Sequence, residues 1–138
     1  MNIKYKINEP VKAEQFIKLL VKSTLGERRP IDDSVCIEGM LNNSNLTVSA
    51  WDGDKLVGFA RSMTDFHYAC YLSDLAVHKD YQKIGIGKKL QMITQGNLGP
   101  KCKLILVAAP DANSYYEHIG FTNNTRCWIL GRDQQIKE

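Results

Sequence analysis

The chain has 138 residues, which is enough for one domain with its own hydrophobic core and too few for two ordinary domains. Its formal net charge of +3 is too small to indicate nucleic-acid binding by itself, and its longest apolar run, at residues 104–110, is far shorter than a membrane span. We therefore expect a single soluble domain over residues 1–138, with no nucleic-acid or membrane partner.

The cysteines do not indicate a metal site. Cys36, Cys70, Cys102 and Cys127 are too far apart for a zinc knuckle or a CxxC motif, and the pair His67 and Cys70 lacks two further ligands at suitable spacing. No neighbouring base marks Cys70 as a nucleophile, which favours a buried thiol. Because no apolar signal segment follows the N-terminus, we expect reduced thiols in the cytoplasm.

A strand and two helices are predicted for the first third of the chain. Residues 3–7 alternate between apolar and polar as a half-buried strand does, and a helix follows Pro10 with apolar residues at helical spacing, namely Phe16, Leu19 and Leu20. After a polar break at residues 23–30, Asp32 or Asp33 can cap a second helix, which carries Val35, Ile37, Met40 and Leu41.

A hairpin and a βαβ unit are predicted next. Strands at residues 46–51 and 55–63 flank Asp52-Gly53-Asp54, which tolerates the positive φ angles of a tight turn. A strand at residues 70–77 leads through a glycine-containing loop to a helix with one apolar face, formed by Ile86, Leu90 and Ile93. The apolar strand at residues 103–108 fits the centre of the sheet, parallel to the strand before the helix.

The C-terminal segment is predicted to add one helix and one strand. Asp111 can cap a short fourth helix that ends near Gly120, and residues 125–130 supply the last strand. The fold class that follows is a mixed α/β domain.

The loop between residues 82 and 87 has the properties of an anion site. Gly85 and Gly87 have no Cβ, so the backbone can bend sharply and approach a ligand closely, and the first N–H groups of the following helix lack intrahelical partners. Lys83, Lys88 and Lys89 oppose the helix dipole there, a cost that a bound anion would offset.

Two segments resemble one family. The loop fits the pattern (Arg/Gln)-x-x-Gly-x-(Gly/Ala) with Gln82-Lys83-Ile84-Gly85-Ile86-Gly87, and Leu75-Ala76-Val77 precedes it at the usual distance. Downstream, an aromatic-Tyr-Glu-x-x-Gly-Phe segment is matched by Tyr115-Tyr116-Glu117-His118-Ile119-Gly120-Phe121. Over nearly its whole length the chain resembles the GNAT superfamily of acetyl-CoA-dependent N-acetyltransferases. The resemblance implies a twisted, mostly antiparallel sheet with a central parallel βαβ unit flanked by helices.

The resemblance also implies a binding mode for acetyl-CoA, without a metal. Backbone N–H groups from Gln82 through Lys88 would hold the pyrophosphate, that is, those of Gln82, Lys83, Ile84, Gly85, Ile86, Gly87 and Lys88. Leu75, Ala76 and Val77 would pair with the pantetheine arm as an added strand and supply an oxyanion donor. Asn113 would contact the cofactor as well.

For catalysis, the resemblance implies direct attack of a free amine on the thioester, with no covalent enzyme intermediate. Tyr116 would protonate the departing thiolate. Many relatives carry Glu two residues before the Leu-x-Val segment, where this chain has Ser73. The candidates for the base are therefore Asp74, Glu27 and His67, in that order.

The acceptor is expected against residues 23–30, residues 61–65 and the last hairpin. Glu27 and Asp65 suit a polyamine or aminoglycoside, whereas Arg28, Arg29 and Arg61 suit an acceptor with a carboxylate or phosphate. The sequence does not choose between these, nor between a small molecule and a peptide or protein amine, and it leaves a homodimer open.

Other interpretations remain open at this point. The chain can be a non-catalytic acetyl-CoA sensor, or a nucleotide binder whose glycine loop imitates the family motif. Individually, the glycines can serve only a strand-to-helix turn, Tyr116 can be a core aromatic, and Asp74 can simply accept hydrogen bonds at the sheet edge.

Overall fold

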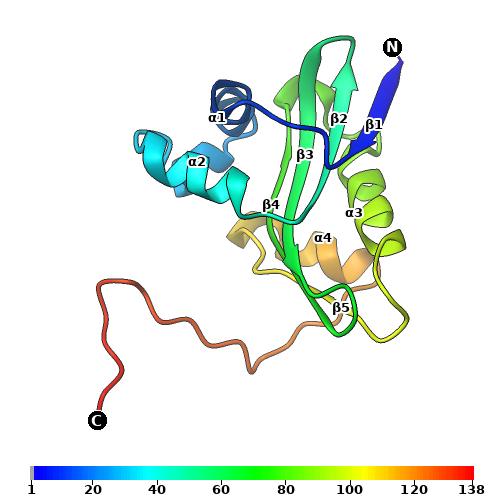
Figure 1. Cartoon of the computed structure of the whole chain (residues 1–138). Helices are drawn as coiled ribbons and strands as arrows, with labels where there is room; N and C mark the ends of the chain where they lie inside the picture. The colour runs from blue at the N-terminus through cyan, green and yellow to red at the C-terminus, as the bar shows by residue number, and fades with distance from the viewer. Residues whose placement is uncertain (1) are drawn as a thin grey trace. The chain divides into compact units, whose positions relative to one another are not determined.

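The computed structural model of the chain describes residues 2–138 (Figure 1). The strands are β1 Ile3–Ile7, β2 Leu46–Asp52, β3 Lys55–Thr64, β4 Ala69–Val77 and β5 Lys103–Ile105. The α-helices are α1 Ala13–Lys22, α2 Ser34–Asn42, α3 Ile86–Gly96 and α4 Asn113–His118, with 3-10 helices η1 Leu25–Arg28, η2 Lys79–Tyr81 and η3 Pro110–Ala112. No helix in the described chain combines the length and the apolarity that crossing a bilayer requires.

The five strands form one mixed sheet in the order β1-β2-β3-β4-β5. The first three pairings are antiparallel, and β4 pairs with β5 in parallel, so the predicted mixed α/β class and the parallel βαβ unit are confirmed. The predicted place of the strand at residues 103–108 is wrong, because β5 has three residues and lies at the sheet edge. Leu104 and Leu106 pack against the core beside α3. This packing accounts for the apolar run, although β5 has a neighbouring strand on one side only.

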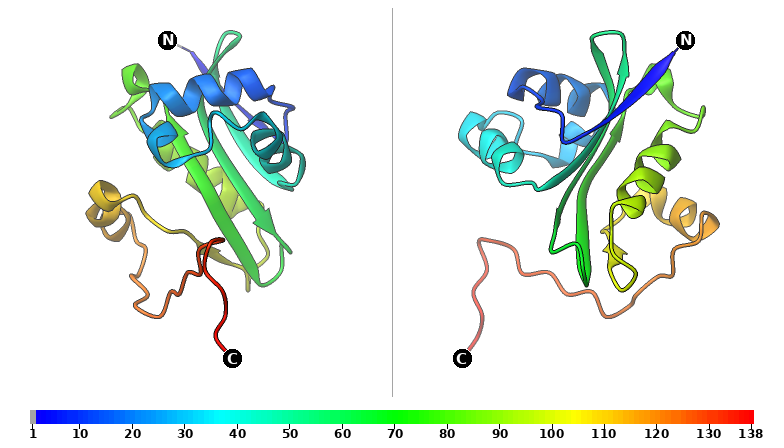
Figure 2. Two further views of the ribbon diagram at one scale, coloured as in Figure 1. Left: turned by 90° about the vertical axis from the view of Figure 1, so that its left-hand side faces the viewer. Right: turned by 45° about the vertical axis from the view of Figure 1, so that its right-hand side comes forward.

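The sheet separates two hydrophobic clusters, with α1 and α2 on one face and α3 on the other (Figure 2). The cluster beside α1 and α2 includes Phe16, Leu19, Leu20, Ile37, Phe59 and Ala76. The cluster beside α3 includes Val48, Ala50, Val57, Ala60, Leu72, Ile86 and Leu90. Each fully buried large side chain stabilises the fold by roughly 1.5–3 kcal/mol relative to an exposed one.

Local signals placed most of these elements correctly. Asp33 caps α2 by accepting from the N–H of Cys36 at 3.0 Å, and Gly53 takes a positive φ of 63° in the turn between β2 and β3. Of the apolar residues that the predicted second helix carries, Val35 is 81% exposed. It lies in the first turn of α2 on the side away from Ile37, where nothing covers it.

The described chain divides into two compact units, one up to residue 106 and one from residue 107. In the second unit α4 begins at Asn113, directly after η3, and has no side-chain cap, so the predicted cap by Asp111 is wrong. The predicted strand at residues 125–130 is also wrong, since no strand forms in this unit and Trp128 is 91% exposed. A strand needs a partner for its backbone groups, and this unit offers none. One domain over residues 1–138 stays a prediction.

Candidate functional site

Most of β4 has no strand on its second edge within residues 2–138. β5 pairs with β4 only at Ala69, Cys70 and Tyr71, so the rest of β4 pairs with β3 alone. The N–H of His78 donates to the carbonyl oxygen of Val57 at 2.8 Å. Because antiparallel partners alternate between bonded and non-bonded pairs, the backbone groups of Val77 and Leu75 then point away from β3, toward the open edge.

A β-bulge at Ser73 sets the two faces of β4. The pairing shifts from Arg61↔Asp74 to Ser62↔Leu72, which leaves Ser73 as an extra residue on β4. Leu75 and Val77 accordingly pack on the α3 side, together with Leu72, whereas Asp74 and Ala76 face the side of α1 and α2. A bulge also bends and twists its strand, consistent with the separation of β4 from β5 beyond this point.

The loop before α3 presents free backbone N–H groups. Gly85 is the N-cap of α3 with a φ of 90° and provides no side-chain cap, and a Cβ at this position would meet no atom within 4 Å. The first turn contains no acidic residue but does contain Lys88 and Lys89, both exposed. Lys83 also has a positive φ, of 65°. An open, uncapped and positively charged helix start is suited to an anion.

The loop and the open strand edge adjoin each other. The side-chain Nε2 of Gln82 donates to the carbonyl oxygen of Val77 at 3.0 Å. A Cβ on Gly87 would lie 3.6 Å from Cγ2 of Val77, an ordinary contact. The two sequence segments that were predicted to bind one ligand, residues 75–77 and 82–88, therefore form one continuous surface.

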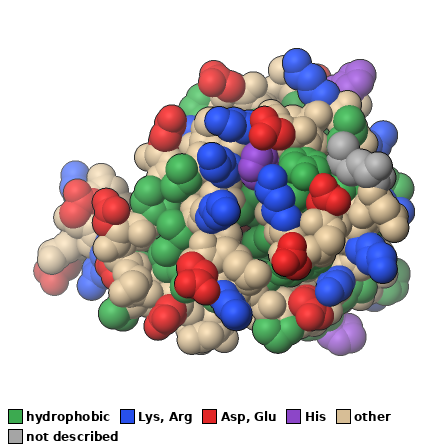
Figure 3. Space-filling model, turned by 90° about the horizontal axis from the view of Figure 1, so that it is seen from above, with side chains coloured by type: hydrophobic (Ala, Val, Ile, Leu, Met, Phe, Trp, Pro, Cys, Tyr) green, Lys and Arg blue, Asp and Glu red, His purple; other side chains and the backbone are tan. Residues whose placement is uncertain are grey.

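Lysines surround the end of β4 as well. Burial and the charge of Lys55, followed by smaller contributions from Lys22 and Lys79, lower the pKa of His78, against the opposing effect of Asp80. Figure 3 shows this end of the molecule from above, with Lys and Arg side chains across it and Asp and Glu side chains among them. The lysines around His78 thus favour a negatively charged ligand at the end of β4.

Asp74 lies in an ion-pair network on the opposite face of β4. Its two carboxylate oxygens accept from Nε of Arg29 and Nε of Arg61, and its side chain is completely buried. Arg29 also donates to the carbonyl oxygen of Ser73 at 2.8 Å, and Arg61 donates to Ser73 Oγ at 3.0 Å and to Ser44 Oγ at 2.9 Å. The network joins the end of η1 and the end of α2 to strands β3 and β4. Both oxygens of Asp74 are thus engaged by guanidinium groups, which suits a structural role for this carboxylate.

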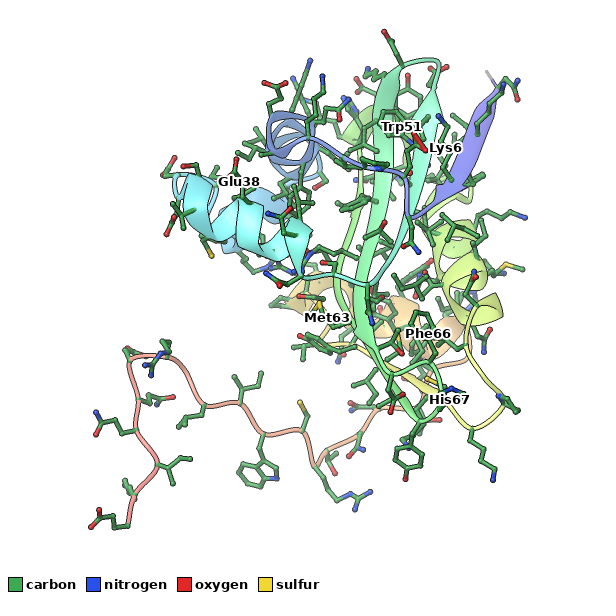
Figure 4. The ribbon with its side chains drawn as sticks, in the orientation of Figure 1. Lys6, Glu38, Trp51, Met63, Phe66 and His67 are labelled. Atoms are coloured by element: carbon green, nitrogen blue, oxygen red, sulfur yellow. The ribbon has the colours of Figure 1, made fainter. Side chains whose placement is uncertain are left out.

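The other two candidates for the base lie elsewhere. His67 is in the turn between β3 and β4, at the far end of the strands from the glycine loop (Figure 4). From there to Leu75 is roughly 25 Å along β4 at the rise of a strand. Glu27 is exposed on η1.

Two predicted site residues, Tyr116 and Asn113, belong to the second unit. Tyr116 is half-buried on α4 and packs edge-on against Phe121, with ring centroids 5.4 Å apart. Burial and, to a lesser extent, neighbouring Tyr115 raise the pKa of Tyr116, which keeps its hydroxyl protonated at neutral pH. Asn113 is exposed at the first position of α4.

Sequence reasoning missed the pairing of Asp74 with Arg29 and Arg61. A signal was present, because Arg61 and Asp74 are charged residues in the interior of mostly apolar strands, and a buried charge needs a partner. The bulge at Ser73 had no such signal. Among residues 2–138, no group of three or more His, Cys, Asp or Glu side chains is placed to hold a metal ion.

Comparisons with known proteins agree on one family. The model of the acetyltransferase (GNAT) domain matches residues 26–127. An uncharacterized ycf52-like N-acetyltransferase of Prochlorococcus marinus is 33% identical over 112 residues, 77% of this chain and 61% of that protein. A GNAT family acetyltransferase from Streptococcus pneumoniae has a TM-score of 0.76 at 25% identity, with 96% of this chain and 100% of that chain covered.

An aminoglycoside N-acetyltransferase solved in complex with CoA has a similar fold. It gives a TM-score of 0.71 at 16% identity, with 96% of this chain and 95% of that chain covered. The chain spans about half the length of the curated relatives it matches.

Proposed function

The chain belongs to the GNAT acetyltransferase family, and from that premise we propose that it transfers acetyl from acetyl-CoA to a primary amine. The observation that carries the proposal is the continuous surface formed by the open edge of β4 and the uncapped start of α3. One part offers strand-like backbone pairing and the other offers an anion site, and the pantetheine arm and pyrophosphate of coenzyme A require these two features.

The residues present fit the cofactor. Gly85 leaves open space in front of the helix, and the backbone N–H groups from Gln82 to Lys88 would hold the pyrophosphate. Leu75 and Val77 would pair with the pantetheine arm through the backbone groups that face away from β3. When bound, acetyl-CoA supplies an activated acyl group whose thioester carbon accepts the amine.

The chain's own residues would position and polarise the reacting groups. A backbone N–H at Leu75 or Val77 is available on the open edge to stabilise negative charge on the thioester oxygen. As the new C–N bond forms and the C–S bond breaks, a base or a chain of water molecules would take the proton that the amine loses. Tyr116 would give its own proton to the departing sulfur, a role that suits a phenol with a raised pKa. We assign Asp74 to holding Arg29 and Arg61 rather than to removing the amine proton, because both of its oxygens already accept from guanidinium groups.

A second candidate function is an acetyl-CoA sensor without catalysis. The commitment of Asp74 to two arginines favours it, since the first candidate for a base is thereby occupied. The two functions differ in whether acetyl is transferred, while both require the cofactor surface.

Calorimetric titration with acetyl-CoA, desulfo-CoA and NAD tests whether the protein binds the cofactor, which both functions require. Selective binding of the CoA compounds is expected, and a preference for NAD or no binding would refute the cofactor assignment. A panel of amines, with free CoA measured by a thiol reagent, then separates enzyme from sensor. Transfer to any amine above the rate of thioester hydrolysis excludes a purely sensing role.

A further inference from the structure

One face of β3 and β4 is only partly covered in the first unit. Met63 on β3 pairs with Tyr71 on β4, two residues along β3 from Arg61, which pairs with Asp74. Nη1 of Arg61 lies 3.5 Å from Sδ of Met63. The side chains of Arg61, Asp74, Met63 and Tyr71 therefore share the face of the sheet on which α2 lies. Met63 is labelled in Figure 4. Tyr71 is 39% exposed, so an aromatic ring and a thioether form an accessible apolar surface next to the ion-pair network.

The network has one positive charge in excess. Arg29 and Arg61 share the single carboxylate of Asp74, and within residues 2–138 neither guanidinium has a second carboxylate within 4.0 Å. The side chains of Arg61 and Asp74 are 5% and 0% exposed, so water screens this charge poorly. Arg28, next in the chain and exposed, adds a further positive charge. An anion would complement this charge.

Arg29 is the member of the network that can reach a ligand. Its side chain is 22% exposed, and its Nε, Nη1 and Nη2 donate to Asp74, to the Arg28 carbonyl at 2.9 Å and to the Ser73 carbonyl at 2.8 Å. A guanidinium has five N–H donors, so two remain for a carboxylate or phosphate. Arg61, in contrast, is enclosed by Asp74, Ser73 and Ser44.

We propose that this face binds the acceptor and selects a primary amine that also carries a carboxylate or phosphate group. The inference rests on the proposed acetyl transfer. Ser73, whose carbonyl and hydroxyl bond the two arginines, is two residues from Leu75 on the reacting edge, roughly 7 Å along the strand. The anion would therefore lie within a short carbon chain of the amine, with the remaining carbon skeleton over Tyr71 and Met63.

The same geometry argues against a polycationic acceptor on this face. A polyamine or aminoglycoside would meet the excess positive charge of the network and have to bind to acids instead. Of the two acids that sequence analysis offered, Asp65 uses Oδ1 to accept the N–H groups of His67, Tyr68 and Ala69. Its Oδ2 accepts none of these bonds, so Asp65 and the exposed Glu27 are the two acids on which such an acceptor would depend.

Matched pairs of acceptors test the proposal by calorimetry, with the protein saturated with CoA. L-Phenylalanine is compared with 2-phenylethylamine, and O-phosphoethanolamine with ethanolamine, so that each pair differs by the anionic group. The acidic member of at least one pair is expected to bind about tenfold or more tightly, the effect of one charged hydrogen bond. Equal binding within both pairs, or binding of none of the four, overturns the proposal.

Variants at neighbouring arginines locate the effect. Arg29→Gln should remove the preference for the acidic member, and Arg29→Lys should restore part of it, whereas Arg28→Gln should leave most of it. Loss of preference in Arg28→Gln but not in Arg29→Gln would overturn the assignment. If Arg29→Gln does not fold, the wild-type pairs decide alone. Failure of CoA to bind would instead count against the proposed function. The titration with CoA alone, done before any acceptor is added, reports that failure separately.

Discussion

Gly58 lies on β3 where α3 packs closest to the sheet, and replacing it by Ala should disturb both the fold and the cofactor surface. A Cβ at Gly58 would lie 2.9 Å from Cγ2 of Ile86, 3.1 Å from Cδ1 of Leu90 and 3.2 Å from Cβ of Ala50. All three partners are buried in the cluster beside α3. Because a well-packed core cannot absorb a methyl group freely, Gly58→Ala should lower the free energy of unfolding by about 1–3 kcal/mol.

The displacement should also reach the anion site. Ile86 is the first residue of α3 and directly follows Gly85, so moving its side chain away from β3 shifts the free N–H groups of the first turn. Acetyl-CoA affinity should therefore fall together with stability. A core substitution with no ligand contact would then weaken ligand binding.

Urea unfolding and acetyl-CoA titration measure the two effects. Gly39→Ala is the matched control, since Gly39 lies inside α2 and its Cβ would meet nothing within 4 Å. This control should gain about 0.5–1 kcal/mol, the usual advantage of Ala over Gly in a helix. An unfolding free energy for Gly58→Ala equal to or above that of the wild type would refute the packing argument.

Further predictions concern the loop, the catalytic acid and two acidic residues. Gly87→Glu should abolish acetyl-CoA binding in calorimetry while Gly87→Gln, of equal size, loses less, because only the former places negative charge at the phosphate site; equal losses would point to size alone. Tyr116→Phe should lower turnover with little change in acetyl-CoA affinity, and an unchanged rate removes Tyr116 from the mechanism. Asp74→Asn should cost about 3 kcal/mol or more in urea unfolding, since the buried guanidinium of Arg61 and the partly buried one of Arg29 lose their shared partner; a cost below 1 kcal/mol would contradict the network. Three backbone N–H groups lower the pKa of Asp65 from 3.8 to about 2, so its contribution to stability is full above pH 3.8 and is lost as the pH falls through 2; a carboxyl NMR titration with a midpoint near 3.8 would show that these bonds are absent in solution.

Local sequence patterns were sufficient where one element could be recognised by itself. The helical spacing of Phe16, Leu19 and Leu20 located α1, and all three side chains are buried. The Asp-Gly sequence at residues 52–53 located the turn between β2 and β3. The glycine loop was likewise visible, because its chemistry depends on consecutive residues.

Features that depend on which strands become neighbours were not predictable in the same way. The apolar run at residues 103–108 indicated burial but could not reveal that β5 ends the sheet. Residues 125–130 have the composition of a strand, yet a strand forms only with a partner. The position of Asp74 between two arginines, one of them 45 residues away in the sequence, likewise arises from tertiary structure.

The uncapped, lysine-bearing start of α3 has a consequence for how much folded protein persists. The dipole of α3 and the charges of Lys88 and Lys89 oppose each other until an anion binds, so part of the fold's stability resides in the ligand. By mass action, a ligand at 100 times its dissociation constant adds about 2.7 kcal/mol to the free energy of unfolding. The melting temperature and the resistance to proteases would then rise and fall with the concentration of that anion. The abundance of the protein would follow the concentration of its ligand without any change in synthesis.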